Sequence, residues 1–91
     1  MITSQKKPWI EAVMDALWRI YEGNNNRRIT YQQIQIKELD KIKRETQTKG
    51  KTPDRTLSKI LQIIRDRGYL IFEDNQGTYI LTDKFFEDYQ G

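Results

Sequence analysis

The sequence predicts a small α+β domain, with three helices followed by an antiparallel hairpin and a short closing helix. Three segments before residue 68 carry apolar residues at helical spacing. Two β-prone runs separated by a polar turn follow them. A length of 91 residues suits one hydrophobic core and falls well short of the size at which chains divide into two. We therefore expect residues 1–91 to form a single domain.

The segment PWIEAVMDALWRIYEG predicts the first helix. Trp9, Val13 and Leu17 recur at every fourth residue, and an apolar face built on this spacing has to be buried against other elements. Proline is tolerated in the first turn of a helix, and glycine favours its end. We therefore expect the first turn at Pro8 and the end at Gly23.

The segment ITYQQIQIKELDKIKRE predicts a second helix that starts near Tyr31. Thr30 is a good N-cap, and Gln33 three residues later completes a capping box. The later apolar residues keep helical spacing less regularly, which leaves open a break or bend before the polar stretch TQTKGK. Ile29, just before the cap, is β-prone and offers a third strand to the hairpin.

The segment TPDRTLSKILQIIRDRG predicts a third helix from both its ends and its apolar stripe. Thr52 stands at the N-cap, Pro53 at the first helical position and Gly68 just past the end. Four aliphatic residues follow the i, i+3, i+4, i+7 pattern of a buried helix face. They are Leu57, Ile60, Leu61 and Ile64.

Residues 69–72 and 78–81 predict the two strands of a hairpin, with Gly77 ending the turn between them. An isolated hairpin is only marginally stable in water, so one of its faces has to pack against the helices. Thr82 then offers the cap of a short closing helix. We expect the packed face to carry Leu70, Phe72, Tyr79 and Leu81, or their alternate neighbours.

This order of elements is the order of a winged helix-turn-helix, in which three helices, a two- or three-stranded antiparallel wing and a short C-terminal helix surround one core. The stretch GKTPDRTLSKILQIIRDRGYLIFEDNQGTYIL also resembles the winged-helix domains attached to modification-dependent and other restriction endonucleases. The resemblance covers about the last half of the chain. The matching positions are Thr52, Gln62, Arg65, Asp66, Gly68, Phe72, Gly77, Thr78, Tyr79 and Leu81.

The resemblance implies a reader of double-stranded DNA that places the third helix, residues 53–67, in the major groove as a recognition helix. It also implies a regulator or targeting module of a restriction-modification system, which works beside a catalytic partner or domain, or with a second copy of itself. These 91 residues hold no counterpart of the nuclease part of those enzymes. The resemblance therefore does not imply cleavage.

The composition argues against most enzyme chemistry. The chain has no cysteine and no histidine, which removes thiolate nucleophiles, imidazole bases and the usual zinc ligands. It also lacks a GxxxxGK[ST] loop, and no Asp-x-Lys or Glu-x-Lys nuclease motif follows Pro53 and Asp54. We therefore expect a protein that is not an enzyme and has no cofactor or metal.

Location follows from hydropathy. No apolar run approaches the ~18 residues that cross a bilayer, and the first residues lack the apolar core of a signal peptide. We therefore expect a cytoplasmic protein with no membrane partner.

Positive charge is concentrated in the middle of the chain. The net charge is +3, but residues 41–67 hold nine Lys or Arg against three Asp or Glu, a balance of +6. Residues 1–40 hold six against five, and residues 68–91 hold one against five, which gives balances of +1 and −4. Such a basic segment favours a polyanionic partner, here double-stranded DNA.

The predicted DNA site combines one face of the third helix with basic side chains near it. Because successive helical residues turn by about 100°, an inward apolar stripe leaves other positions facing outward. Arginine and lysine match guanine edges, and glutamine matches adenine. The predicted base contacts are Arg55, Ser58, Lys59 and Gln62. The predicted phosphate contacts are Lys49, Lys51 and Thr52, at a helix N-terminus suited to anions, and Arg27, Arg28, Lys43 and Arg44.

The predicted wing fits this picture less well. Glu73 and Asp74 make its tip acidic, and like charge repels the DNA backbone. We expect either a wing held off the backbone or one that reads base edges through Asn75 and Gln76. The same acidity supports an alternative function, in which a winged helix binds protein or forms dimers through the acidic hairpin and tail.

Overall fold

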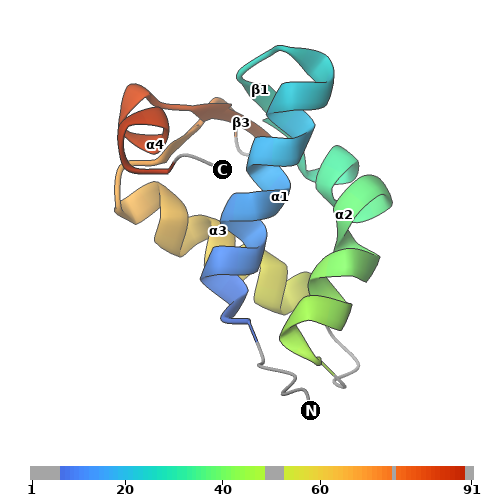
Figure 1. Ribbon diagram of the computed structural model, residues 1–91. Helices are drawn as coiled ribbons and strands as arrows, with labels where there is room; N and C mark the ends of the chain where they lie inside the picture. The colour runs from blue at the N-terminus through green and yellow to red at the C-terminus, as the bar shows by residue number, and fades with distance from the viewer. Residues whose placement is uncertain (1–6, 49–52, 75, 90–91) are drawn as a thin grey trace.

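The elements follow the predicted order along the chain. The computed structural model describes residues 7–48, 53–74 and 76–89. Within them lie α1 (Trp9–Asn24), β1 (Arg28–Thr30), α2 (Tyr31–Thr46), α3 (Pro53–Asp66), β2 (Leu70–Phe72), β3 (Thr78–Leu81) and α4 (Asp83–Asp88). The three long helices lie around a small antiparallel sheet, with α4 near one end of it (Figure 1). The predicted α+β class is confirmed.

The ends of α1 differ from the prediction. Pro8 is the N-cap, with extended backbone, and the helix begins at Trp9. Gly23 lies within the last turn, whereas Asn25 takes the left-handed conformation (φ 51°) and donates its backbone N–H to the carbonyl of Tyr21. Asparagine adopts this conformation more readily than most residues that carry a side chain. The helix therefore continues past its glycine and is capped by an asparagine.

The start of α2 confirms the predicted capping box. The Thr30 hydroxyl oxygen accepts a hydrogen bond from the backbone N–H of Gln33 (3.1 Å), and the Gln33 side-chain oxygen accepts one from the backbone N–H of Thr30 (2.9 Å). The residues just before this cap pair with β3, so the third strand offered by Ile29 also forms.

α2 continues without a break to Thr46 because polar residues complete its buried stripe. Ile34, Glu38, Ile42 and Thr46 are buried at four-residue spacing. Glu38 accepts hydrogen bonds from Arg19 Nε and Nη2 at 2.9 and 2.6 Å, and the Thr46 hydroxyl donates to the Ile42 carbonyl at 2.8 Å. The break left open before TQTKGK therefore does not occur ahead of Thr46.

The end of α3 carries the predicted glycine. Gly68 has φ 90°, and its N–H donates to the Arg65 carbonyl at 2.9 Å. The N–H of Tyr69 donates to the Ile64 carbonyl at 3.1 Å. These two bonds form a Schellman motif, which needs a left-handed residue that glycine supplies without strain. At the other end Pro53 is the first helical residue as predicted, while Thr52 lies outside the described residues.

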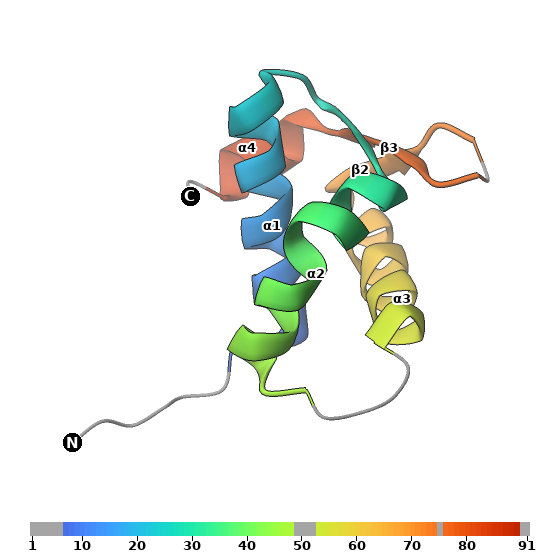
Figure 2. The ribbon, with the colours of Figure 1, turned by 90° about the vertical axis from the view of Figure 1, so that its right-hand side faces the viewer.

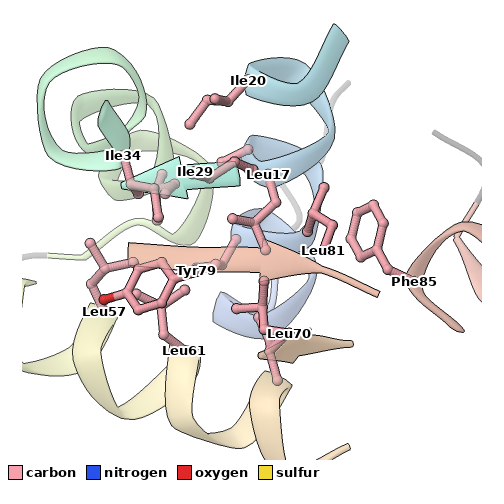
Figure 3. Close-up of a cluster of buried hydrophobic side chains, with 14 of the residues drawn as sticks. Leu17, Ile20, Ile29, Ile34, Leu57, Leu61, Leu70, Tyr79, Leu81 and Phe85 are labelled. Carbon is pink, nitrogen blue, oxygen red and sulfur yellow. The ribbon is translucent and has the colours of Figure 1, made fainter. Parts of the chain in front are cut away.

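The sheet has the strand order β1-β3-β2. In the register of its strands Tyr79 stands between Ile29 and Phe72, and side chains from the three long helices meet these residues in the core. Of the two hairpin faces that the prediction left open, the first-named one packs against the helices, and the alternate residue Ile71 is 54% exposed. Figure 3 shows how the core forms between sheet and helices, with Leu17 and Ile20 from α1, Ile34 from α2, Leu57 and Leu61 from α3, and Leu70, Tyr79, Leu81 and Phe85.

α4 closes one end of the sheet through its aromatic residues. Phe85 is fully buried, and its ring centroid lies 6.4 Å from that of Trp18 on α1. Thr82 stands at the N-cap as predicted, but its hydroxyl donates to the Gly68 carbonyl at 2.5 Å and makes no capping bond to α4. This bond ties the start of α4 to the end of α3.

Candidate nucleic-acid interface

Three of the four predicted base-contact residues are exposed on the outward face of α3. Arg55, Lys59 and Gln62 are exposed, while Ser58 is half-buried beside them. Leu57, Leu61 and Ile64 are buried on the opposite side. The exposed residues follow i, i+4, i+7 spacing, so they form one stripe along the helix. The structure therefore presents a row of hydrogen-bond donors of the type that base edges accept.

Tyr31, the first residue of α2, links the first turn of α3 to the hairpin. The Tyr31 hydroxyl donates to the Asp54 carbonyl at 3.1 Å, and Gln35 Nε2 donates to Asp54 Oδ1 at 3.3 Å. The backbone N–H of Tyr31 also donates to the Gly77 carbonyl at 2.7 Å. Gly77 has φ 94°, and a Cβ there would lie 3.1 Å from the Tyr31 Cβ. Close backbone contact thus fixes where the hairpin turn lies relative to the start of α3.

Several basic side chains already have carboxylate partners. Arg27 Nη1 lies 2.6 Å from Asp83 Oδ1, and the Arg27 guanidinium also lies over the Phe86 ring, 4.7 Å from its centroid. Arg28 Nη2 lies 2.6 Å from Glu73 Oε2. These two arginines are predicted phosphate contacts, so a phosphate has to compete with a carboxylate for each. The other pairs are Lys7 with Asp15 and Glu45, Arg19 with Glu38, Arg65 with Asp66, and Lys84 with Asp88.

The remaining basic side chains within the described ranges make no ion pair, and all lie on or next to α2 and α3. Exposed charges without a partner contribute fully to the potential around this part of the molecule. Figure 2 shows α3 and the hairpin turn on one side of the molecule, with α4 on the other. The unpaired residues are Lys37, Lys41, Lys43 and Arg44 on α2, Arg55 and Lys59 on α3, and Arg67 just after α3.

The end of α2 forms a shallow open hollow. Lys43 and Arg44 line it together with Asp40, Gln47 and Thr48. Both cations stand in the last turn, where they complement the negative end of the helix dipole. They therefore have a structural use besides the predicted contact with phosphate.

Four predicted site residues lie outside the described residues. Lys49, Lys51 and Thr52 precede α3, and Asn75 belongs to the hairpin turn. Gln76 is described and exposed, and its backbone N–H donates to Asp74 Oδ1 at 3.0 Å.

The acidic residues of the hairpin have internal uses that the sequence prediction missed. Asp74 Oδ1 also accepts from the backbone N–H of Thr78 at 3.2 Å, so this carboxylate organises the turn. Aspartate is favoured in turns for this reason, which is the signal that could have revealed its role. Glu73 is held by Arg28. The hairpin is thus less negative to an approaching polyanion than its composition indicates.

A second cluster of charges joins the segment before α1 to α1 and to the end of α4. Lys7 Nζ donates to Asp15 Oδ2 at 2.7 Å, and the Tyr89 hydroxyl donates to Asp15 Oδ1. Burial raises the pKa of Tyr89, and its hydrogen bond to Asp15 raises it further. Burial also raises the pKa of Tyr79 in the core, to about 12. Hydroxyls with raised pKa values stay neutral at physiological pH.

Among the described residues, no helix is long and apolar enough to cross a membrane. No group of three or more Asp or Glu side chains there is placed to hold a metal ion.

The chain was also compared with known proteins. No protein-family model, no curated protein and no solved structure matches it. The resemblance to winged-helix domains of restriction endonucleases therefore stays a prediction, and the placement of the charges becomes the main support for a function.

Proposed function

We propose that the chain is a winged helix-turn-helix that binds double-stranded DNA without cleaving it, with α3 as the recognition helix. The observation that carries the proposal is the separation of its cations. Basic residues on α1, β1 and α4 have carboxylate partners, whereas those on α2 and two of the three on α3 make no ion pair within the described residues. DNA affinity depends mainly on cations that can replace the counterions of phosphates.

The exposed stripe of α3 suits the major groove, which is wide enough to admit a helix. From Arg55 to Gln62 the helix rises by about 10 Å at ~1.5 Å per residue. This length matches about three base-pair steps at ~3.4 Å each. Arg55 and Lys59 would donate to guanine O6 and N7, and Gln62 would pair with adenine. Ser58, half-buried between them, would add a shorter-range contact.

Phosphate contacts would position the protein without reading sequence. The unpaired cations of α2, Lys43 and Arg44 among them, are the described candidates, and Lys49, Lys51 and Thr52 remain predicted ones at the start of α3. The hairpin would act as the wing, and the bond between Tyr31 and Gly77 would hold it near the recognition helix. Following the resemblance, the chain would serve as a regulator or targeting module of a restriction-type system, beside a catalytic partner or a second copy of itself, in the cytoplasm.

The second candidate function is protein association or dimerisation through the hairpin. Ile71 is 54% exposed on the open face of the sheet, which favours contact with an apolar partner surface. The acidic residues of the hairpin and tail give this second function less support, because cations of the same chain already neutralise three of them. They are Glu73, Asp83 and Asp88.

Affinity for duplex DNA tests the first function against the second. A preferred duplex would be selected from a random library, and binding to it and to a scrambled duplex would be measured in Arg55→Gln and Lys59→Gln. Each change should lose about 1–3 kcal/mol on the preferred duplex and much less on the scrambled one. Lys84→Gln removes the same charge from α4 and should weaken binding to neither duplex.

Two results would contradict the proposal. Equal losses on both duplexes would remove the assignment of base reading to α3. An unaltered chain that binds no duplex even at low salt would remove DNA binding altogether and favour protein association.

A further inference from the structure

The ion pair between Arg28 and Glu73 crosses the open face of the sheet. Arg28 belongs to β1 and Glu73 directly follows β2, so the pair spans the central strand β3. The pairing of Arg28 with Ile80, and of Ile80 with Ile71, places Arg28 on the face turned away from the core. Both side chains are well exposed, at 58% and 36%. The pair is therefore accessible to a ligand from solvent.

Arg28 is held less firmly than its neighbour Arg27. The Arg27 guanidinium has both a carboxylate partner and an aromatic ring beneath it. For the Arg28 guanidinium the described residues supply Glu73 Oε2 alone, through Nη2 at 2.6 Å. The remaining donors of its planar fork are left to solvent. An anion that accepts from the same fork could take the place of Glu73 without breaking other side-chain contacts.

The position of Arg28 brings it close to the proposed DNA site. It stands three residues before Tyr31, which contacts both the first turn of α3 and the hairpin turn. Glu73 directly follows β2, at the start of the hairpin turn that Tyr31 contacts. This hairpin projects on the side of the molecule that carries α3 (Figure 2). A duplex on α3 would therefore bring its backbone near this pair.

We propose that Glu73 is an internal counterion of Arg28 and that a DNA phosphate replaces it when the duplex binds. Carboxylate and phosphate accept from a guanidinium in the same forked geometry, so the exchange conserves the hydrogen bonds of Arg28. This inference rests on the proposed DNA binding and adds a regulatory element to it. Glu73 then lowers the affinity for DNA because it occupies Arg28 in the free protein, and not only because its charge repels the DNA backbone.

The inference predicts that removing a charge from the hairpin strengthens binding through Arg28. In Glu73→Gln, duplex affinity at low salt should rise about threefold to tenfold, because Arg28 no longer has to leave a carboxylate. The slope of log K against log salt should stay nearly the same, since Arg28 contacts a phosphate in both complexes. Glu87→Gln is the matched control, because Glu87 is exposed on α4 and its side chain makes no hydrogen bond or ion pair with any residue that the structure describes. Its affinity should stay close to that of the unaltered chain.

A double-mutant cycle separates exchange from simple repulsion. In an Arg28→Gln background, Glu73→Gln should give little or no gain, because the residue that Glu73 occupies is gone. An equal gain in both backgrounds would overturn the inference, since Glu73 would then act on the DNA directly. No gain from Glu73→Gln in an unaltered chain that does bind duplex would also overturn it while leaving the proposed function standing. Failure of the unaltered chain to bind any duplex would overturn both.

Discussion

The basic residues of two regions of this molecule have the same chemistry and different surroundings. On α1, on β1 and just before it, and on α4, each basic residue is matched by a carboxylate; these residues are Arg19, Arg27, Arg28 and Lys84. No basic residue on α2 or along the exposed stripe of α3 forms an ion pair within the described residues. The first group is already matched by carboxylates of the protein, and Arg28 is the member of it that we propose exchanges its carboxylate for a phosphate. The second group leaves its charge for a partner. The comparison shows that the net charge of a segment is a poor guide to binding until the partners of its cations are known.

The largest expected effect comes from breaking the most buried pair. Glu38 is 12% exposed, and Arg19 supplies the two hydrogen bonds seen on its side chain. Arg19→Met should lower the free energy of unfolding by about 3 kcal/mol, because a nearly buried carboxylate loses its partner. Urea unfolding measures this loss, and Arg19→Met combined with Glu38→Leu should recover most of it. A single variant as stable as the unaltered chain would show that this pair has no structural use.

The Asp15 cluster predicts acid sensitivity. Burial raises the pKa of Asp15, but hydrogen bonds from Lys7 and Tyr89 outweigh it, and the pKa falls below its ordinary value of 3.8. Because the folded pKa lies below the unfolded one, this stabilisation is complete above the unfolded pKa and is lost as the pH falls through the folded value. Urea unfolding at decreasing pH should therefore show a smaller acid loss in Asp15→Asn than in the unaltered chain. The same acid loss in both chains would contradict this assignment.

Removing one unpaired cation tests the other side of the comparison. Lys41→Gln should leave stability within about 0.5 kcal/mol, since it removes an exposed residue without an ion pair. Its affinity for all duplexes should fall alike, by about fivefold to tenfold at low salt, with the salt slope reduced by about 0.9. Fluorescence anisotropy over a salt series measures both quantities. A loss limited to one sequence would show that Lys41 reads bases.

The smallest expected effect belongs to an exposed pair. Arg27 and Asp83 are 49% and 80% exposed, and such pairs contribute about 0–1 kcal/mol. Arg27→Gln should change stability by about 0.5 kcal/mol or less. It should also leave duplex affinity nearly unchanged, because Asp83 and Phe86 hold the guanidinium in the unaltered chain. A loss as large as that in Lys41→Gln would break the distinction between paired and unpaired cations and restore Arg27 as a phosphate contact.

Local signals in the sequence predicted the start of α2 and the end of α3, although not the ends of α1. Thr30 and Gln33 form their capping box, and Gly68 ends α3, because each motif depends on residues at most a few positions apart. Alternation narrowed the packed face of the hairpin to two choices, and the structure has Tyr79 inward and Ile71 outward. These features are decided by short-range geometry, which a sequence shows directly.

Features that depend on distant partners could not be read in the same way. Glu38 and Thr46 continue the buried stripe of α2, but polar residues are expected on a surface until a partner such as Arg19 is known. Arg28 and Glu73 are 45 positions apart, and Arg27 and Asp83 are 56 apart. The sequence therefore predicted where cations are concentrated and could not show which of them are already paired.

Amide-shift mapping of a duplex onto the folded chain tests the central claim most directly. The proposal predicts that titration with a selected duplex moves the amide signals of the exposed stripe of α3, Arg55 to Gln62, and of the turns of α2 that carry its unpaired cations, while those of α4 stay in place. Shifts confined to α4 or to the open face around Ile71, or no shifts at low salt, would contradict the assignment of α3 as a DNA-reading helix.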